Sequence, residues 1–123
     1  MQKLVIENFK CPSRNDSYAG QHWTKRRKKA KTIQALVFAE CKKQNIQPVE
    51  QICDIEVVAY YKYKIRRDSD NVSSKEIIDG LVLAGILKDD SVEFVRKVTT
   101  LAKIGQKKDK VVVKLEHAES AVC

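Results

Sequence analysis

Aspartate residues gather between positions 66 and 90 of a chain that is otherwise strongly basic. Asp68, Asp70, Asp79, Asp89 and Asp90 lie in this stretch, whereas the formal net charge of the 123-residue chain is +8. They fall mainly at the two ends of one predicted helix. Carboxylates held close together repel each other, and a divalent cation relieves that repulsion. The stretch therefore predicts a divalent metal ion held against a polyanionic partner.

Asp68 and Asp70 are expected to lie at the end of a strand, on the same side of the chain. Residues i and i+2 of an extended chain project to one face and are roughly 7 Å apart. Two such carboxylates can share one Mg²⁺ or flank two. The alternative is that Asp70 or Asn71 only caps the helix that follows. Capping explains one of these residues but not the whole run from Asp68 to Asn71.

Asp89 and Asp90 follow the predicted helix and precede the next strand. A helix of about 14 residues is about 20 Å long, so its carboxyl end lies far from Asp70. For Asp90 to meet Asp68 and Asp70, the segment 85–88 must run back along the helix. A site composed of residues from two subunits is the alternative, and a solvated acidic turn is the third interpretation.

Lys75 lies within the predicted helix, four residues before Asp79. This spacing favours an exposed ion pair on one helix face. The functional interpretation is that Lys75 contacts the reacting phosphate or its developing negative charge. Spacing alone does not separate the two.

Basic residues are clustered in the chain rather than spread evenly. Six of seven consecutive positions at the start of a predicted helix are basic, namely Lys25, Arg26, Arg27, Lys28, Lys29 and Lys31. A second group comprises Lys107, Lys108 and Lys110. Such clusters bind nucleic acid through its phosphates, with strong salt dependence and no base specificity. An anionic membrane or an acidic protein is the alternative partner.

The hydrophobic pattern predicts a single α+β domain over residues 1–123. The expected strands and helices alternate in the order β-α-β-α-β-β, at about residues 2–9, 24–45, 51–65, 71–84, 92–104 and 111–115. We expect a mixed sheet with the helices packed on one side.

Cysteine usage and hydropathy point to a cytoplasmic protein. The four cysteines are widely spaced and lack the spacing of a zinc site, and Cys41 and Cys53 fall on predicted apolar faces as buried thiols. No apolar run reaches the roughly 18 residues of a membrane helix. We expect no membrane partner and no organic cofactor.

The chain resembles the RusA-type Holliday junction resolvases, which are small endonucleases of phages and prophages. The resemblance rests on motifs in the same order over most of the chain. They are Pro12-Ser13-Arg14-Asn15, the stretch from Tyr18 to Trp23, Arg66-Arg67-Asp68-Ser69-Asp70-Asn71, Lys75, Asp79-Gly80-Leu81, and the run from Gly85 to Asp90.

The resemblance implies that Asp68, Asp70 and Asp90 are catalytic, metal-binding acids and that Lys75 is a further catalytic residue. Asp89 is exchangeable with Asp90 as a metal ligand. Mg²⁺ is the implied cofactor, with Mn²⁺ as a substitute. The resemblance also implies a homodimer that makes paired nicks across a four-way DNA junction. Arg66 and Arg67 join the basic helix residues as DNA contacts. The alternatives are a related phage nuclease for other branched DNA and a junction-binding protein without catalysis.

Overall fold

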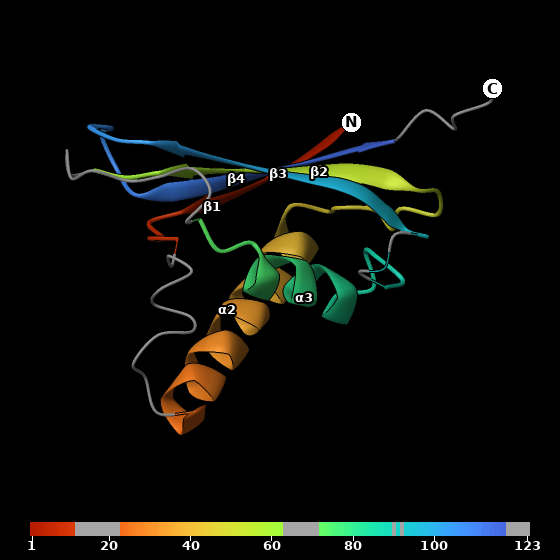
Figure 1. The fold of residues 1–123 in the computed structure, drawn as a ribbon, viewed down its shortest axis with the longest axis horizontal. Coiled ribbons are helices and arrows are strands. Elements are labelled where there is room, and N and C mark those ends of the chain that lie inside the picture. The colour runs from red at the N-terminus through yellow and green to blue at the C-terminus, as the bar shows by residue number, and fades with distance from the viewer. Residues whose placement is uncertain (12–22, 63–71, 90, 92, 118–123) are drawn as a thin grey trace.

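The computed structural model contains a four-stranded sheet with two helices on one of its faces (Figure 1). It describes residues 1–11, 23–62, 72–89, 91 and 93–117, except for the side chains of residues 23–26. The elements are β1 (Gln2–Glu7), α2 (Trp23–Lys43), β2 (Cys53–Tyr60), α3 (Lys75–Leu83), β3 (Val95–Lys103) and β4 (Lys110–His117). The predicted α+β class, order of elements and mixed sheet are confirmed.

The strands lie in the order β1-β4-β2-β3. Strand β4 is antiparallel to both β1 and β2, whereas β2 and β3 are parallel. It follows that β1, β2 and β3 all point in one direction. Their carboxyl ends therefore lie at the same end of the sheet. The segments that follow β1 and β2 start from this end.

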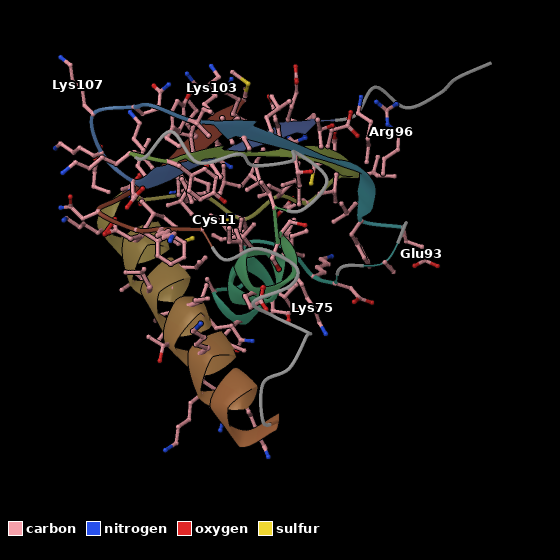
Figure 2. All side chains as sticks on the ribbon, turned by 60° about the vertical axis from the view of Figure 1, so that its left-hand side comes forward. Cys11, Lys75, Glu93, Arg96, Lys103 and Lys107 are labelled. Atoms are coloured by element: carbon pink, nitrogen blue, oxygen red, sulfur yellow. The ribbon has the colours of Figure 1, made fainter. Side chains whose placement is uncertain are left out.

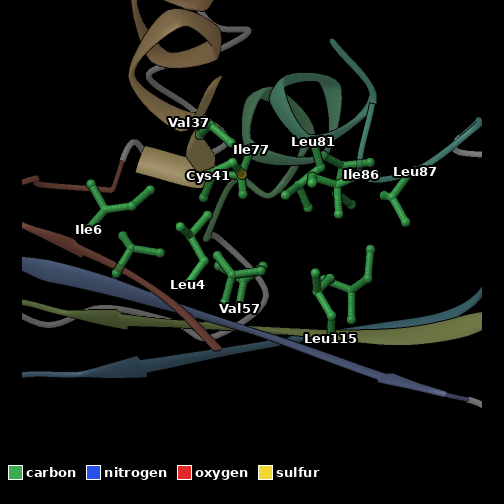
Figure 3. Packing of buried hydrophobic residues seen from close by; sticks show 14 of the residues in the cluster. Leu4, Ile6, Val37, Cys41, Val57, Ile77, Leu81, Ile86, Leu87 and Leu115 are labelled. Atoms are coloured by element: carbon green, nitrogen blue, oxygen red, sulfur yellow. The ribbon is translucent and has the colours of Figure 1, made fainter. Parts of the chain in front are cut away.

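The core lies between the helices and the inner face of the sheet (Figure 3). Alternate residues of each strand point to one face, so Ile55 and Val57 of β2 share the core with Val113 of β4 and Leu4 of β1. The alternation predicted for β2 is confirmed over Cys53, Ile55, Val57, Ala59 and Tyr61, all of which are buried. Tyr63 and Ile65, which were expected to continue it, lie outside the described residues.

Strand β3 begins later than its hydrophobic pattern indicates, and its inward face is only partly covered. Between Cys53 and Asp54 the register shifts, because Cys53 pairs with Val95 and Asp54 with Lys97. Arg96 is the extra residue of this bulge, which turns Val95 toward the core. Val98 pairs with the inward residue Ile55 but remains 41% exposed. This exposure arises because β3 is an edge strand, at the margin of the helical layer.

Both helices of the described residues lie on one side of the sheet, and neither covers its opposite face (Figure 1). One apolar residue from each strand forms a row across it, since Val5 pairs with Val112, Val112 with Val58, and Val58 with Leu101. Val58 is only 3% exposed despite this position. Charged residues of the same strands flank the row, for example Lys114 beside Glu56, whose charged groups lie 4.0 Å apart.

Helices α2 and α3 contact each other as well as the sheet. On α2 the buried residues Ile33, Val37 and Cys41 recur every fourth position, as predicted for an amphipathic helix. Gly80 of α3 faces Val37, and a Cβ atom built on Gly80 would lie 2.7 Å from the Val37 Cβ. The absence of a side chain at Gly80 is therefore what allows the two helices to approach this closely.

The end of α3 is fixed by a Schellman motif. Gly85 has a φ of +77°, its N–H bonds to the Val82 carbonyl, and the Ile86 N–H bonds to the Leu81 carbonyl at 2.9 Å. Ile86 is buried, and its carbonyl accepts a hydrogen bond of 2.8 Å from the N–H of Val49. The chain after α3 is thus anchored beside the loop that leads into β2.

Substitution of Gly80 by alanine is predicted to destabilise the fold. Alanine favours a helix by about 1 kcal/mol over glycine, but the clash with Val37 outweighs this gain, and we expect a net loss of about 1–3 kcal/mol. Urea unfolding measures the difference. In the Gly80→Ala, Val37→Ala double variant the two losses should sum to less than their separate values. Strictly additive losses would contradict the proposed contact.

Candidate functional site

Three of the four predicted metal ligands, Asp68, Asp70 and Asp90, lie outside the described residues. Arg66 and Arg67, predicted to contact DNA, lie outside them as well. The fourth acid, Asp89, is exposed. Within the described ranges no three histidine, cysteine or acidic side chains come together as a metal site. The predicted ligand set therefore stays a prediction, and the structure positions only the residues that flank it.

Lys75 is the first residue of α3 and its side chain is exposed. The sequence pattern placed it about one turn inside a helix that begins at residue 71, so the predicted start of the helix is wrong by four residues. At the new position Lys75 belongs to the first turn of α3, where the backbone N–H groups have no partner within the helix. Because these groups carry the positive end of the helix dipole, Lys75 adds charge to a region that already favours anions. The predicted ion pair with Asp79 stays a prediction.

The residues that flank the predicted acids lie at opposite ends of α3. Val72, which follows Asp68 and Asp70 in sequence, precedes the first turn of the helix, whereas Asp89 follows its last turn. A helix of nine residues is about 13 Å long. In Figure 1 the green start and the teal end of this region are on opposite sides of α3.

The segment after α3 does not run back along the helix as one interpretation of the sequence requires. Both Ile86 and Leu87 donate backbone hydrogen bonds to the Leu81 carbonyl, at 2.9 and 3.3 Å, so they stay at the last turn. The N–H of Val95 then bonds to the Ser91 carbonyl at 2.9 Å, at the start of β3. These contacts contradict the return of segment 85–88 along the helix. A site shared by two subunits and a solvated acidic turn both stay open as predictions.

A buried polar cluster connects the segments that lead to this region. The Ser73 hydroxyl donates to the Glu76 carboxylate at 2.7 Å, and the Cys11 thiol donates to the Ser73 carbonyl at 3.5 Å. The Tyr61 hydroxyl donates to the Cys11 carbonyl at 3.2 Å. All four residues are buried. The cluster therefore joins the chain after β1, the chain after β2 and the residues that precede α3.

The sequence contains a signal for this cluster that hydrophobic periodicity does not reveal. Ser73 and Glu76 have the Ser-x-x-Glu spacing of a capping box, which marks the start of a helix. Here the two side chains contact each other directly, and Ser74 occupies the capping position. Recognising the motif would have moved the predicted start of the helix close to Lys75.

The predicted basic cluster, residues 25–31, occupies the amino-terminal half of α2. Lys25 and Arg26 belong to the helix backbone, but their side chains are outside the described part of the structure. Arg27, Lys28, Lys29 and Lys31 are exposed. The first turn contains no acidic residue. Cations at the amino end of a helix are unfavourable, and a bound anion would relieve this.

Lysines also line a cavity beside the connection between β3 and β4. The cavity has a volume of about 350 Å³, and its lining residues are Glu7, Gln106, Lys107, Lys108 and Lys110. The sequence identified the lysines as a cluster but not their arrangement. Glu7 comes from β1, and Lys110 pairs with it across the strands, so the cavity was not readable from any single segment.

The predicted burial of Cys41 and Cys53 is confirmed, and Cys11 is buried as well. Burial raises the pKa of the Cys11 thiol to about 12, and the negative charge of Glu76 contributes to the same shift. The pKa of Cys41 is raised to about 11, again mainly by burial and also by the charge of Glu40. Both thiols are therefore in the protonated, unreactive form at neutral pH.

The raised pKa of Cys11 predicts a loss of stability at alkaline pH. In the unfolded chain this thiol ionises near its ordinary pKa of 9.0, whereas in the folded protein it stays protonated up to about pH 12. Its contribution is therefore complete below pH 9 and declines above it, by up to about 1.4 kcal/mol per pH unit. Urea unfolding between pH 8 and 10.5 should show a steeper decline for the wild type than for Cys11→Ala. Equal slopes would contradict the prediction.

Comparison of the sequence with models of known protein families and with curated proteins finds no match.

Proposed function

We propose that this protein is a Mg²⁺-dependent endonuclease that resolves four-way DNA junctions by paired phosphodiester hydrolysis, in the cytoplasm. The observation that carries the proposal is the group of acids around α3 in a chain of net charge +8. The exposed Lys75 at the amino end of that helix supports it. So do the exposed basic residues of α2, which provide a surface for the phosphates of the substrate.

Asp68, Asp70 and Asp90 are the proposed ligands, with Asp89 as a neighbour able to exchange with Asp90. Their carboxylate oxygens are the hard donors that Mg²⁺ prefers, and Mn²⁺ accepts the same set. The bound ion would lower the pKa of a water molecule and stabilise the departing oxygen. Lys75 would bind the reacting phosphate and stabilise the negative charge that develops on it.

A homodimer is part of the proposal because one α3 separates the two groups of acids. Asp68 and Asp70 precede the helix, and Asp90 follows it, beyond residues that are anchored at its last turn. A two-fold arrangement can bring the start of one α3 close to the end of the other. It produces two equivalent sites, which matches the symmetry of a four-way junction and the need for paired nicks.

Two alternatives use the same surfaces. A related nuclease would cut other branched DNA, and only its preference among substrates would differ. A protein that binds junctions without cutting them needs the basic residues but gains nothing from acids that repel phosphate. The acidic group therefore favours catalysis over binding alone.

Asparagine at position 70 is predicted to abolish cleavage. Purified wild-type protein should cut a synthetic four-way junction in Mg²⁺ and not in EDTA, and Asp70→Asn should lower the rate by at least about 100-fold because a metal ligand loses its charge. The matched control is Asp54→Asn, which removes a carboxylate of β2 that pairs with Arg96 of β3 and is not one of the proposed ligands. Unchanged cutting by Asp70→Asn would contradict the assignment.

Mixing two inactive variants tests whether the site is shared between subunits. If each site takes Asp70 from one subunit and Asp90 from the other, a mixed dimer of Asp70→Asn and Asp90→Asn has one site with both substitutions. Its other site retains both native acids. Random exchange makes about half of the dimers mixed, so about a quarter of the wild-type nicking rate should return. Sites built within one subunit would give no recovery, and that result would contradict the shared arrangement.

A further inference from the structure

In the sheet order β1-β4-β2-β3, strand β2 lies between β4 and β3. The chain that connects β3 to β4 therefore crosses the carboxyl end of β2. We call residues 104–109 the crossing loop. Its backbone is fixed to the neighbouring segments, since the Gln106 N–H bonds to the Tyr61 carbonyl at 3.0 Å and the Asp109 carboxylate accepts from the Lys62 N–H at 2.8 Å. The Phe9 N–H bonds to the Asp109 carbonyl at 3.3 Å. The crossing loop is therefore held at both of its ends.

Four lysines surround this loop without a carboxylate partner among the described residues: Lys103, Lys107, Lys108 and Lys110. Two of them contact an aromatic ring instead, with the ammonium groups of Lys103 and Lys110 at 5.4 and 4.9 Å from the ring centroid of Tyr60. Lys107, Lys108 and Lys110 line the cavity of about 350 Å³. Like charges gathered in this way favour the binding of an anion.

These lysines are far from the basic half of α2. Figure 2 shows Lys103 and Lys107 above the sheet, whereas Lys75 lies below it with the helices. The amino end of α2 points away from the sheet, on the side where both helices lie (Figure 1). Since a helix of 21 residues is about 31 Å long, one short straight duplex would not readily contact both surfaces.

We propose that Lys103, Lys107, Lys108 and Lys110 form a second DNA-binding surface, which holds the phosphate backbone of an arm other than the one bound at α2. The inference rests on the proposed function for the identity of the polyanion. Lysine ammonium groups bind phosphates as point charges, which suits contact with a backbone independent of sequence. The surface is built from strands and a fixed loop rather than from the amphipathic helix that is typical of binding to a membrane surface.

Substitution of Glu7 tests the surface by an expected gain in DNA affinity rather than a loss. Its carboxylate lines the same cavity as the three lysines and would repel a phosphate bound there. Glu7→Gln should therefore tighten DNA binding, by about two- to fivefold at low salt. A role of the lysines in folding alone would not produce this increase.

The experiment measures DNA binding in EDTA, so that cleavage plays no part. Fluorescence anisotropy of a labelled four-way junction is recorded over a series of NaCl concentrations. Lys107→Gln, Lys108→Gln should weaken binding about tenfold near 0.1 M salt and reduce the slope of log K against log salt by about 1.8, the value for two lost phosphate contacts. The control, Lys42→Gln, Lys43→Gln, removes the same charge from the last turn of α2 and should change affinity less than twofold.

Equal effects of the two double variants, or an affinity of Lys107→Gln, Lys108→Gln within twofold of the wild type, would overturn the inference. Loss of binding to phosphatidylserine vesicles with unchanged DNA binding would overturn it in favour of a membrane. The outcomes are separate from those of the nuclease proposal. DNA binding that depends on these lysines without Mg²⁺-dependent cutting would refute the nuclease alone, and normal cutting with no dependence on these lysines would refute this surface alone.

Discussion

Burial of a single face of the sheet by two helices that touch at Gly80 and Val37 is the constraint on which the rest of the structure depends. Protein interiors are close-packed, so the distance between α2 and α3 decides how both of them cover the strands. Figure 3 shows Val37, Ile77 and Leu81 above the inner residues Leu4 and Val57. A wider separation would uncover the middle of the sheet. The direction of α3, and with it the position of its two ends, follows from this contact.

The direction of α3 matters because the predicted chemistry lies beyond its ends. The helix follows β2 and precedes β3, and these strands are parallel. The residues before α3 therefore lie near the end of the sheet where β2 stops, while those after it lie near the opposite end, where β3 begins. Hydrogen bonds among Cys11, Ser73 and Glu76 hold the chain in place before α3. The hydrogen bond between Val49 and Ile86 holds it in place after the helix. The fold therefore places Val72 and Asp89, the described residues that flank the predicted acids in sequence, at opposite ends of α3.

Much of the fold could be predicted from the sequence because its periodic signals are strong. The alternation through Ile55 and Val57 and the helical repeat of Ile33, Val37 and Cys41 identify their elements directly. The start of α3 at Lys75 was missed because the Ser73–Glu76 motif was not recognised. The exposure of Val98 could not be predicted, because strand order is not encoded in local periodicity. Candidate site residues were identified by type and spacing. The cavity at Glu7 and Lys110 was not, since it depends on a contact between β1 and β4 that are distant in sequence.

We propose that the acids before and after α3 in sequence support the hydrolysis of phosphodiester bonds in branched DNA. Mapping of the nicks on a four-way junction with each strand end-labelled in turn tests it most directly. We expect nicks in Mg²⁺ at symmetrically related positions on two opposite strands, and none on a linear duplex of the same sequence. Tight binding of the junction with all four strands intact in Mg²⁺ and in Mn²⁺ would contradict it.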